Sequence, residues 1–250
     1  MGVDSGLPDF RGPEGFWKAY PALKHLRVSF SQMANPRWFD ERPAMAWAFY
    51  GHRFQLYART PPHRGYELLR RWAAGKPRGG FVFTSNVDGH FAKAGFPDHG
   101  IYECHGSLRH LQCNVGCSRE IWELDELDLE IDLETLTAHG ELPRCGRCGG
   151  LARPNVLMFG DWSWISERSH AQERRLERWL SEAVGRRLAV VECGAGTAVP
   201  TVRMFCESTA RQLGAALIRI NPKESQGPTG TLSLALPARA ALEQIERVGV

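Results

Sequence analysis

The sequence predicts an α/β fold, in which helices cover both faces of a parallel sheet and a small zinc-binding module is inserted into the chain. Short apolar runs of strand length alternate with helical patterns over most of the sequence, and this alternation is typical of a doubly wound sheet. Two close cysteine pairs flank an acidic stretch within residues 108–151, where few apolar residues are available for a separate core. We therefore expect one domain with an inserted metal-binding segment.

The first half of the chain contains two predicted helices and two predicted strands. Residues 1–12 are rich in Gly, Pro and Asp and are expected to form a loop. An amphipathic run predicts a helix over 44–56, and a second helix is expected over 63–74. Short β-branched and aromatic runs predict strands over 81–84 and 101–102, and both runs end in polar residues.

The second half continues the alternation. Strands are expected over 155–159, 188–191 and 217–220, and helices over 167–184 and 202–213. Parallel sheets bind ligands beyond the carboxyl ends of their strands, so the segments that follow the strands are the candidate site. These segments are 85–88, 103–106, 159–161, 193–196 and 221.

Composition excludes some classes of function. The 31 basic and 28 acidic residues are spread along the chain and give a net charge of +3, so we expect no direct binding to nucleic acid. No stretch approaches the roughly 20 apolar residues of a membrane span. We therefore expect a cytoplasmic protein without membrane association.

Cys113, Cys117, Cys145 and Cys148 form two pairs with metal-ligand spacing. Each pair can supply two corners of a tetrahedron from one tight turn. Four thiolates leave no position for water, so we predict one structural Zn²⁺ rather than a catalytic one. The alternative is a pair of redox dithiols or disulfides, which a reducing cytosol and the spacing disfavour.

Several motifs in order resemble the sirtuin family of NAD-dependent protein deacylases, in its bacterial type with a zinc module. Ser-Gly-Leu-Pro-Asp-Phe-Arg-Gly at 5–12 resembles its long signature. Thr-Ser-Asn-Val-Asp at 84–88, His-Gly-Ser at 105–107, the cysteine pairs and Arg-Pro-Asn-Val-Leu-Met-Phe-Gly-Asp at 153–161 then follow in the family's order. The resemblance covers nearly the whole chain.

The resemblance implies a fold, a reaction and a partner. The fold is a single catalytic domain over 1–250, with a Rossmann-like NAD-binding part (61–106 and 153–250), the zinc-binding module (107–152) and a helical insertion with the cofactor loop (13–60). The reaction is the removal of acetyl, or of succinyl or malonyl, from the lysines of a protein substrate, with release of nicotinamide and O-acyl-ADP-ribose.

The resemblance also implies residue roles. His105 is the general base that accepts a proton from the nicotinamide ribose, a task suited to the pKa of histidine, and Asn86 contacts the ribose and an ordered water. Read as isolated residues, Asn86 and Asp88 are equally expected to cap the following helix. The implied cofactor-binding residues are Asp9, Phe10, Arg11, Ser85, Asn86, Val87, Asp88, Gly194, Ala195, Gly196 and Asn221.

The expected substrate-binding residues come from two segments. One matches the strand on which the family binds its peptide by β-augmentation, namely Val156, Leu157, Met158, Phe159 and Gly160. The other matches the Tyr-x-x-Arg of sirtuins that remove succinyl or malonyl groups. Tyr50 and Arg53 share a helix face at this spacing and can bind an acyl carboxylate. The alternative is an exposed helical pair without function.

The sequence departs from the family pattern at its start, because Met1 falls just after the place of the family's first strand and glycine turn. Whether this reflects a truncation or a mis-assigned start, we expect an incomplete phosphate cradle, weak NAD binding and low stability for this chain. Two other functions stay open, namely NAD-dependent ADP-ribosyl transfer or NAD hydrolysis, and a non-catalytic NAD- and zinc-binding module.

Overall fold

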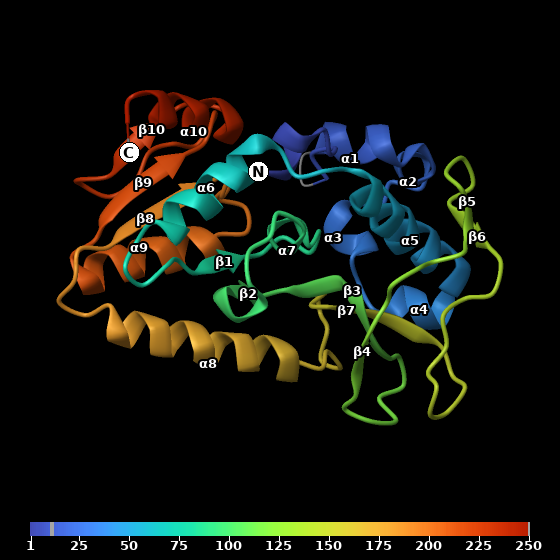
Figure 1. Ribbon diagram of the computed structural model, residues 1–250. Helices are drawn as coiled ribbons and strands as arrows, with labels where there is room; N and C mark the ends of the chain where they lie inside the picture. The colour runs from blue at the N-terminus through green and yellow to red at the C-terminus, as the bar shows by residue number, and fades with distance from the viewer. Residues whose placement is uncertain (11–12, 250) are drawn as a thin grey trace.

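The computed structural model of the chain describes residues 1–10 and 13–249. Arg11, which the family resemblance assigns to the cofactor, lies outside the described residues. The described chain forms a part with parallel strands, a part with antiparallel strands and a group of helices that lies beside both (Figure 1). No helix among these residues is both long and apolar enough to cross a bilayer.

Within the described residues, the part with parallel strands contains five strands in two groups. β1 (Val82–Thr84) pairs in parallel with β2 (Ile101–Glu103). β8 (Ala189–Cys193) and β10 (Leu232–Leu234) each pair in parallel with β9 (Ala216–Ile220), which lies between them. The expected strands over 81–84, 101–102, 188–191 and 217–220 are therefore confirmed within one or two residues at each end.

Four helices pack around these strands. α6 (Arg64–Ala74) and α10 (Ala238–Arg247) pack together, whereas α9 (Thr201–Leu213) contacts β8 and β9, and α8 (Glu167–Glu182) contacts β2. In Figure 1, α10 lies above the strands and α9 lies below them. Helices on two sides of parallel strands confirm the predicted α/β class. The small core between α6, α10 and β9 contains Leu68, Ile220, Ala238, Ala241 and Leu242.

The antiparallel part differs from the prediction. β7 covers Ala152–Val156 and pairs antiparallel with β3 (Gly106–Cys113), whose other edge pairs with β4 (Ile121–Glu123). The strand expected over 155–159 in the parallel sheet was wrong in position and in partner. Its apolar end at Leu157 and Phe159 is exposed, whereas the polar Arg153 and Asn155 are fully buried. The apolar residues therefore placed the predicted strand too far toward the C-terminus.

The helical part is built around α5 (Pro43–Arg59), which extends the helix expected over 44–56 at both ends. The segment has Pro at its first position and contains no β-branched residue, and both features favour a helix. The short hairpin of β5 (Glu130–Asp132) and β6 (Thr137–His139) packs on α5. The remaining short elements are η1 (Gly2–Ser5), α1 (Pro13–Ala19), α2 (Pro21–His25), α3 (Phe30–Met33), α4 (Arg37–Glu41), α7 (His90–Lys93) and η2 (Asp98–Gly100).

The largest core cluster joins the helical part to the antiparallel strands. It contains Trp47, Phe49 and Tyr50 of α5 together with Leu111 of β3 and Val156 of β7. Because α5 is buried on most of its surface, several of its polar side chains point into the interior. Three of them, Tyr50, Arg53 and Tyr57, line the cavity described next.

Candidate active site

A cavity of about 350 Å³ lies where α5, the ends of β1, β2 and β8, and the segment after β7 meet. The structure brings most of the sequence-predicted residues to this one cavity. Those that line it are Asp9, Phe10, Tyr50, Arg53, Ser85, Asn86, Val87, Asp88, His105, Val156, Leu157, Met158, Phe159 and Gly194.

Four expected residues do not line the cavity, namely Gly160, Ala195, Gly196 and Asn221. Ala195 and Gly196 lie in the turn after β8, Asn221 directly follows β9, and hydrogen bonds join these two segments. The Asn221 side-chain amide donates to the Ala195 carbonyl over 3.0 Å, and the Glu224 carboxylate accepts from the Thr197 amide over 3.0 Å.

His105 is held between two strands by backbone contacts. Its carbonyl accepts from the Leu157 amide over 3.0 Å, and the Cys104 amide donates to the Thr84 carbonyl over 2.9 Å. Gly106 has a φ of +76°, and a Cβ there would lie 2.0 Å from the Asn155 carbonyl oxygen. Only glycine allows this approach, so the backbone at His105 is fixed, and the half-buried His105 lines the cavity.

The turn after β1 presents Asn86 and Asp88. The Asn86 amide donates to the Thr84 hydroxyl over 3.1 Å, and the Val87 carbonyl accepts from the Leu108 amide over 3.1 Å. The Asp88 carboxylate accepts from the His90 amide over 3.0 Å, which is a local bond between a side chain and the backbone two residues later. The N-cap of α7 is Gly89, and no side chain among the described residues caps this helix, so the alternative that Asn86 and Asp88 serve as helix caps is wrong.

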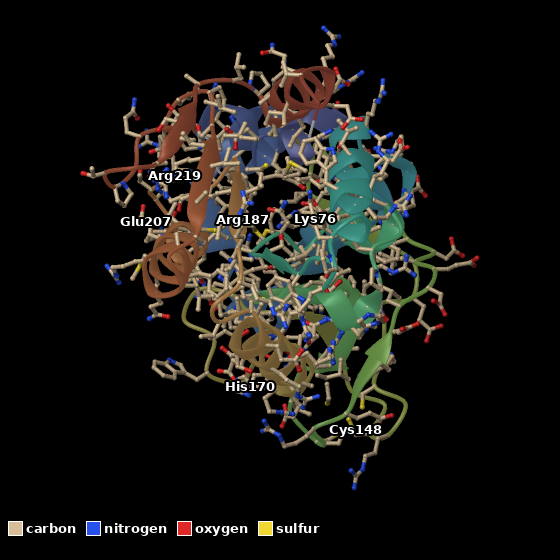
Figure 2. The ribbon with its side chains drawn as sticks, turned by 60° about the vertical axis from the view of Figure 1, so that its left-hand side comes forward. Lys76, Cys148, His170, Arg187, Glu207 and Arg219 are labelled. Atoms are coloured by element: carbon tan, nitrogen blue, oxygen red, sulfur yellow. The ribbon has the colours of Figure 1, made fainter. Side chains whose placement is uncertain are left out.

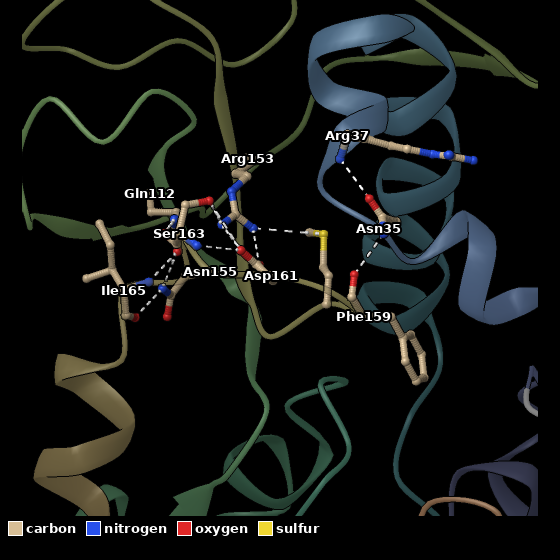
Figure 3. A network of polar contacts seen from close by, with 10 residues as sticks. Asn35, Arg37, Gln112, Arg153, Asn155, Phe159, Asp161, Ser163 and Ile165 are labelled. Carbon is tan, nitrogen blue, oxygen red and sulfur yellow. Dashed lines mark hydrogen bonds and ion pairs between the residues drawn. The ribbon is translucent and has the colours of Figure 1, made fainter.

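The segment after β7 forms one edge of the cavity mouth. Leu157 is 38% exposed and Phe159 is 43% exposed. The Phe159 amide donates to the Ala34 carbonyl over 2.9 Å. The Asn35 side chain donates to the Phe159 carbonyl, also over 2.9 Å (Figure 3). Because both backbone groups of Phe159 are engaged, an added peptide strand has to pair with its neighbours.

A buried polar network supports this edge from behind (Figure 3). The Arg153 guanidinium binds both oxygens of Asp161 over 2.8 and 2.9 Å, and neither side chain is exposed. The Asn155 side chain donates to Gln112 over 2.9 Å and to the Ile165 carbonyl over 2.8 Å. Charge-assisted bidentate pairs of this kind fix geometry well, so the edge is held at both ends.

Tyr50 and Arg53 project from α5 into the cavity. Tyr50 is 1% exposed, and its hydroxyl has no hydrogen-bond partner among the described residues. Burial raises the pKa of this hydroxyl, so it stays a donor. Arg53 is 8% exposed and forms no ion pair within the described part of the chain. The prediction that both side chains share a face holds, but the alternative of an exposed pair is excluded.

The four predicted zinc ligands converge at the far end of the antiparallel part. Their sulfur atoms all lie within 4.8 Å of one another, with Cys113 and Cys148 3.7 Å apart and Cys117 and Cys145 3.5 Å apart. A tetrahedron with Zn–S bonds of ~2.3 Å has edges of about 3.8 Å. The cluster therefore fits one zinc ion. Figure 2 shows Cys148 at the opposite end of the molecule from Arg219 of β9.

Comparison with known proteins gives the family. The model of the Sir2 family matches residues 1–179. The chain belongs to the Sir2 family. It is 28% identical over 225 residues to an NAD-dependent protein deacylase of Aquifex aeolicus, covering 90% of this chain and 81% of that one. It is 31% identical over 222 residues to an NAD-dependent protein deacetylase of Sulfurisphaera tokodaii, covering 88% of this chain and 76% of that one.

Solved Sir2 structures share the fold. A Sir2 homologue in complex with NAD superposes with a TM-score of 0.70 at 25% identity, covering 99% of this chain and 84% of that one. A mutant Sir2 homologue in complex with ADP-ribose superposes with a TM-score of 0.68 at 26% identity, covering 99% and 87%. The predicted family and fold class are therefore confirmed.

The sequence did not point to several residues that line the cavity of this Sir2 protein. Phe30, Ala34, Tyr57 and Val199 come from segments outside the family motifs considered above. A signal for Tyr57 was available, because it lies four residues after Arg53 and therefore on the same helix face. Phe30 and Ala34 reach the cavity only through the fold of α3 against the segment after β7.

Proposed function

We propose that the chain is an NAD-dependent protein-lysine deacylase, which moves the acyl group of an acyl-lysine protein to ADP-ribose and releases nicotinamide. The observation that carries this proposal is that one cavity collects His105, the Asn86–Asp88 turn, the edge at 157–159 and the buried pair of Tyr50 and Arg53. These are the groups needed to bind a nucleotide, a peptide and an acyl group together.

The polar wall of the cavity fits the nicotinamide end of NAD. When bound, NAD supplies an electrophilic ribose carbon and a neutral leaving group. Asp88 and Asn86 bind the carboxamide and the ribose, and Phe10 is part of the cavity wall. His105 accepts a proton from a ribose hydroxyl at its unprotonated ring nitrogen, and the fixed backbone on both sides of it keeps the ring in place.

The acyl end of the cavity favours an acidic acyl group, such as succinyl or malonyl. A buried cation without a carboxylate partner is unfavourable in isolation and becomes favourable when an anion arrives. Arg53 supplies that cation, and the protonated Tyr50 hydroxyl supplies a donor beside it. An acetyl group offers no anion to this pair.

The zinc ion is structural. Cys113, Cys117, Cys145 and Cys148 would fill all four positions of a tetrahedral zinc site, and none of them lines the cavity. Backbone amides of Cys148 and Arg147 lower the pKa of Cys145, whereas the hydrogen bond to Cys145 raises the pKa of Cys117. Thiolates need a reducing compartment, so we place the protein in the cytoplasm.

Acyl-lysine peptides and NAD test the proposal. Acetyl-, succinyl- and malonyl-lysine peptides are incubated with the chain, and products are identified by mass spectrometry. We expect O-acyl-ADP-ribose and free nicotinamide, and loss of both in His105→Ala. His99→Ala is the matched control, since His99 is exposed and does not line the cavity.

Two results would overturn the proposal. An ADP-ribose mass increment on protein without acyl transfer indicates an ADP-ribosyltransferase. Nicotinamide release equal to background in the parent chain and in His105→Ala indicates a binding module.

A further inference from the structure

Tyr57 lies one helical turn after Arg53 on α5 and lines the same cavity. Its hydroxyl oxygen accepts two hydrogen bonds from the guanidinium, over 3.0 Å from Nε and 2.8 Å from Nη2. Both side chains are buried, with exposed fractions of 7% for Tyr57 and 8% for Arg53. We infer that Tyr57 is a positioning residue, which aims the Arg53 guanidinium at the carboxylate of an acidic acyl group. This inference rests on the proposed function.

The hydrogen bonds decide which edge of the guanidinium is open. A guanidinium has five N–H groups and can bind a carboxylate bidentately along the edge of Nε and Nη2 or along the edge of Nη1 and Nη2. Tyr57 occupies the first edge. The end-on edge of Nη1 and Nη2 then remains for a ligand, so an acyl carboxylate meets Arg53 in a single orientation.

Aromatic rings stabilise the charge of Arg53 without neutralising it. Its Cζ lies 5.0 Å from the centroid of Phe10, 5.3 Å from Phe49, 5.8 Å from Phe30 and 5.5 Å from Tyr57. Each ring face attracts a cation but forms no ion pair with it. The guanidinium is thus kept buried and charged while its full charge stays available to an incoming anion.

Tyr57 itself is held in place, as a positioning residue must be. Its ring packs edge-on against Phe10 with centroids 6.3 Å apart. The Lys93 ammonium donates to the carbonyls of Tyr57 over 3.4 Å, Ala58 over 2.6 Å and Thr60 over 3.1 Å, which ties down the last turn of α5. The hydroxyl therefore meets Arg53 from a fixed point.

Tyr57→Phe removes the acceptor and keeps the ring. Without the hydroxyl, the guanidinium loses two hydrogen bonds and can turn its edge away from the acyl group. We expect KM for a succinyl-lysine peptide to rise about tenfold, the size expected for one to two buried charge-assisted hydrogen bonds. We expect kcat for that peptide, and both constants for the acetyl-lysine peptide, to stay within about twofold, because acetyl makes no use of the charge.

Tyr20→Phe is the matched control. Tyr20 is fully buried and packs against Phe10, but its hydroxyl binds His52 Nδ1 over 3.0 Å. Loss of this hydroxyl should leave the ratio of succinyl to acetyl activity unchanged. In an Arg53→Met background, Tyr57→Phe should have no further effect on succinyl KM, since the two residues act as one unit.

The outcomes separate this inference from the proposed function. Binding of the succinyl-lysine peptide to the full chain is also measured by calorimetry, which needs no turnover. If Arg53→Met leaves succinyl binding and turnover unchanged, the acidic-acyl assignment fails. If Arg53→Met abolishes them and Tyr57→Phe does not weaken them, or weakens acetyl and succinyl turnover equally, the assignment stands and the role of Tyr57 is overturned.

Discussion

Arg53 on α5 and Arg153 on β7 are both buried in the same half of the molecule, and their surroundings differ. Arg153 binds both oxygens of Asp161, over 2.8 and 2.9 Å. Arg53 is surrounded by aromatic rings and binds a neutral hydroxyl. A paired buried charge needs nothing further, whereas an unpaired one is suited to a ligand. The contrast separates an arginine that holds the fold from one that serves the site.

Arg219 on β9 is, like Arg153, a buried arginine that is paired with a carboxylate. Its guanidinium binds the Glu192 carboxylate over 2.6 and 2.9 Å and Glu207 over 2.7 Å. Neither Arg219 nor Glu192 is exposed at its side chain. In the described part of the chain, Arg53 is thus the buried arginine of these three that lacks a carboxylate.

The largest effect is expected from Arg153→Met. The change leaves Asp161 buried without its cation, and removal of one partner from a buried pair typically costs about 3–5 kcal/mol. Urea denaturation followed by circular dichroism measures this loss in the free energy of unfolding. The double variant Arg153→Met, Asp161→Leu should recover part of it, because no unpaired charge remains. A loss below about 1 kcal/mol for the single variant would mean that Arg153, like Arg53, does not stabilise the fold.

The two carboxylates that bind Arg219 test how the stability contribution of an ion pair depends on its burial. Glu192 has a fully buried side chain, whereas that of Glu207 is 32% exposed. We expect Glu192→Gln to lower the free energy of unfolding by about 2–3 kcal/mol and Glu207→Gln by about 1 kcal/mol or less, since water screens the second pair. Equal losses in urea denaturation would show that burial does not set the strength of these pairs.

Arg53→Met should lower stability much less than Arg153→Met, or not at all. Methionine fills much of the same volume and removes an uncompensated charge, so we expect the free energy of unfolding to change by less than about 1 kcal/mol or to rise. Denaturation under the same conditions measures it. A loss as large as that of Arg153→Met would mean that Arg53 holds the fold, and the contrast between the two regions would fail.

The sequence predicted the alternation, the cysteine cluster and most of the cavity because these depend on local patterns. Cys113 to Cys148 carry their spacing in the chain, and His105 has its glycine beside it. The position of β7 was missed because Arg153 and Asn155 are polar and buried, and their partners Asp161 and Gln112 become visible only in the fold. Polar residues usually mark a surface, so hydrophobic patterning misplaces such a strand.

The engagement of Phe159 was missed for a different reason. Its bond to Asn35 spans 124 residues, and no local pattern reports a contact between a loop near α3 and the end of β7. Helical spacing, in contrast, does place Tyr57 on the same helix face as Arg53. Tyr57 was overlooked because a tyrosine beside an arginine carries no signal until burial shows that the arginine lacks an anion.

His63 offers a third way to bury a basic group. Its Nδ1 accepts from the Gly65 amide over 3.0 Å, so the ring is neutral in the fold. Burial lowers the pKa of His63 to about 4 from 6.5, against the opposing charge of Asp4. An imidazole can lose its proton when buried, which the guanidinium of Arg53 cannot do.

This difference gives a pH dependence with a fixed sign. Between pH 6.5 and about 4, the unfolded chain binds a proton at His63 that the folded chain does not, so the contribution of His63 to the free energy of unfolding is complete above pH 6.5 and is lost as pH falls toward 4. His63→Asn keeps a side chain that can cap α6 and removes the titration. Urea denaturation of both chains at pH 7.5 and pH 5 should show a shallower fall for the variant, and parallel curves would mean that the protonated ring of His63 is accommodated in the fold.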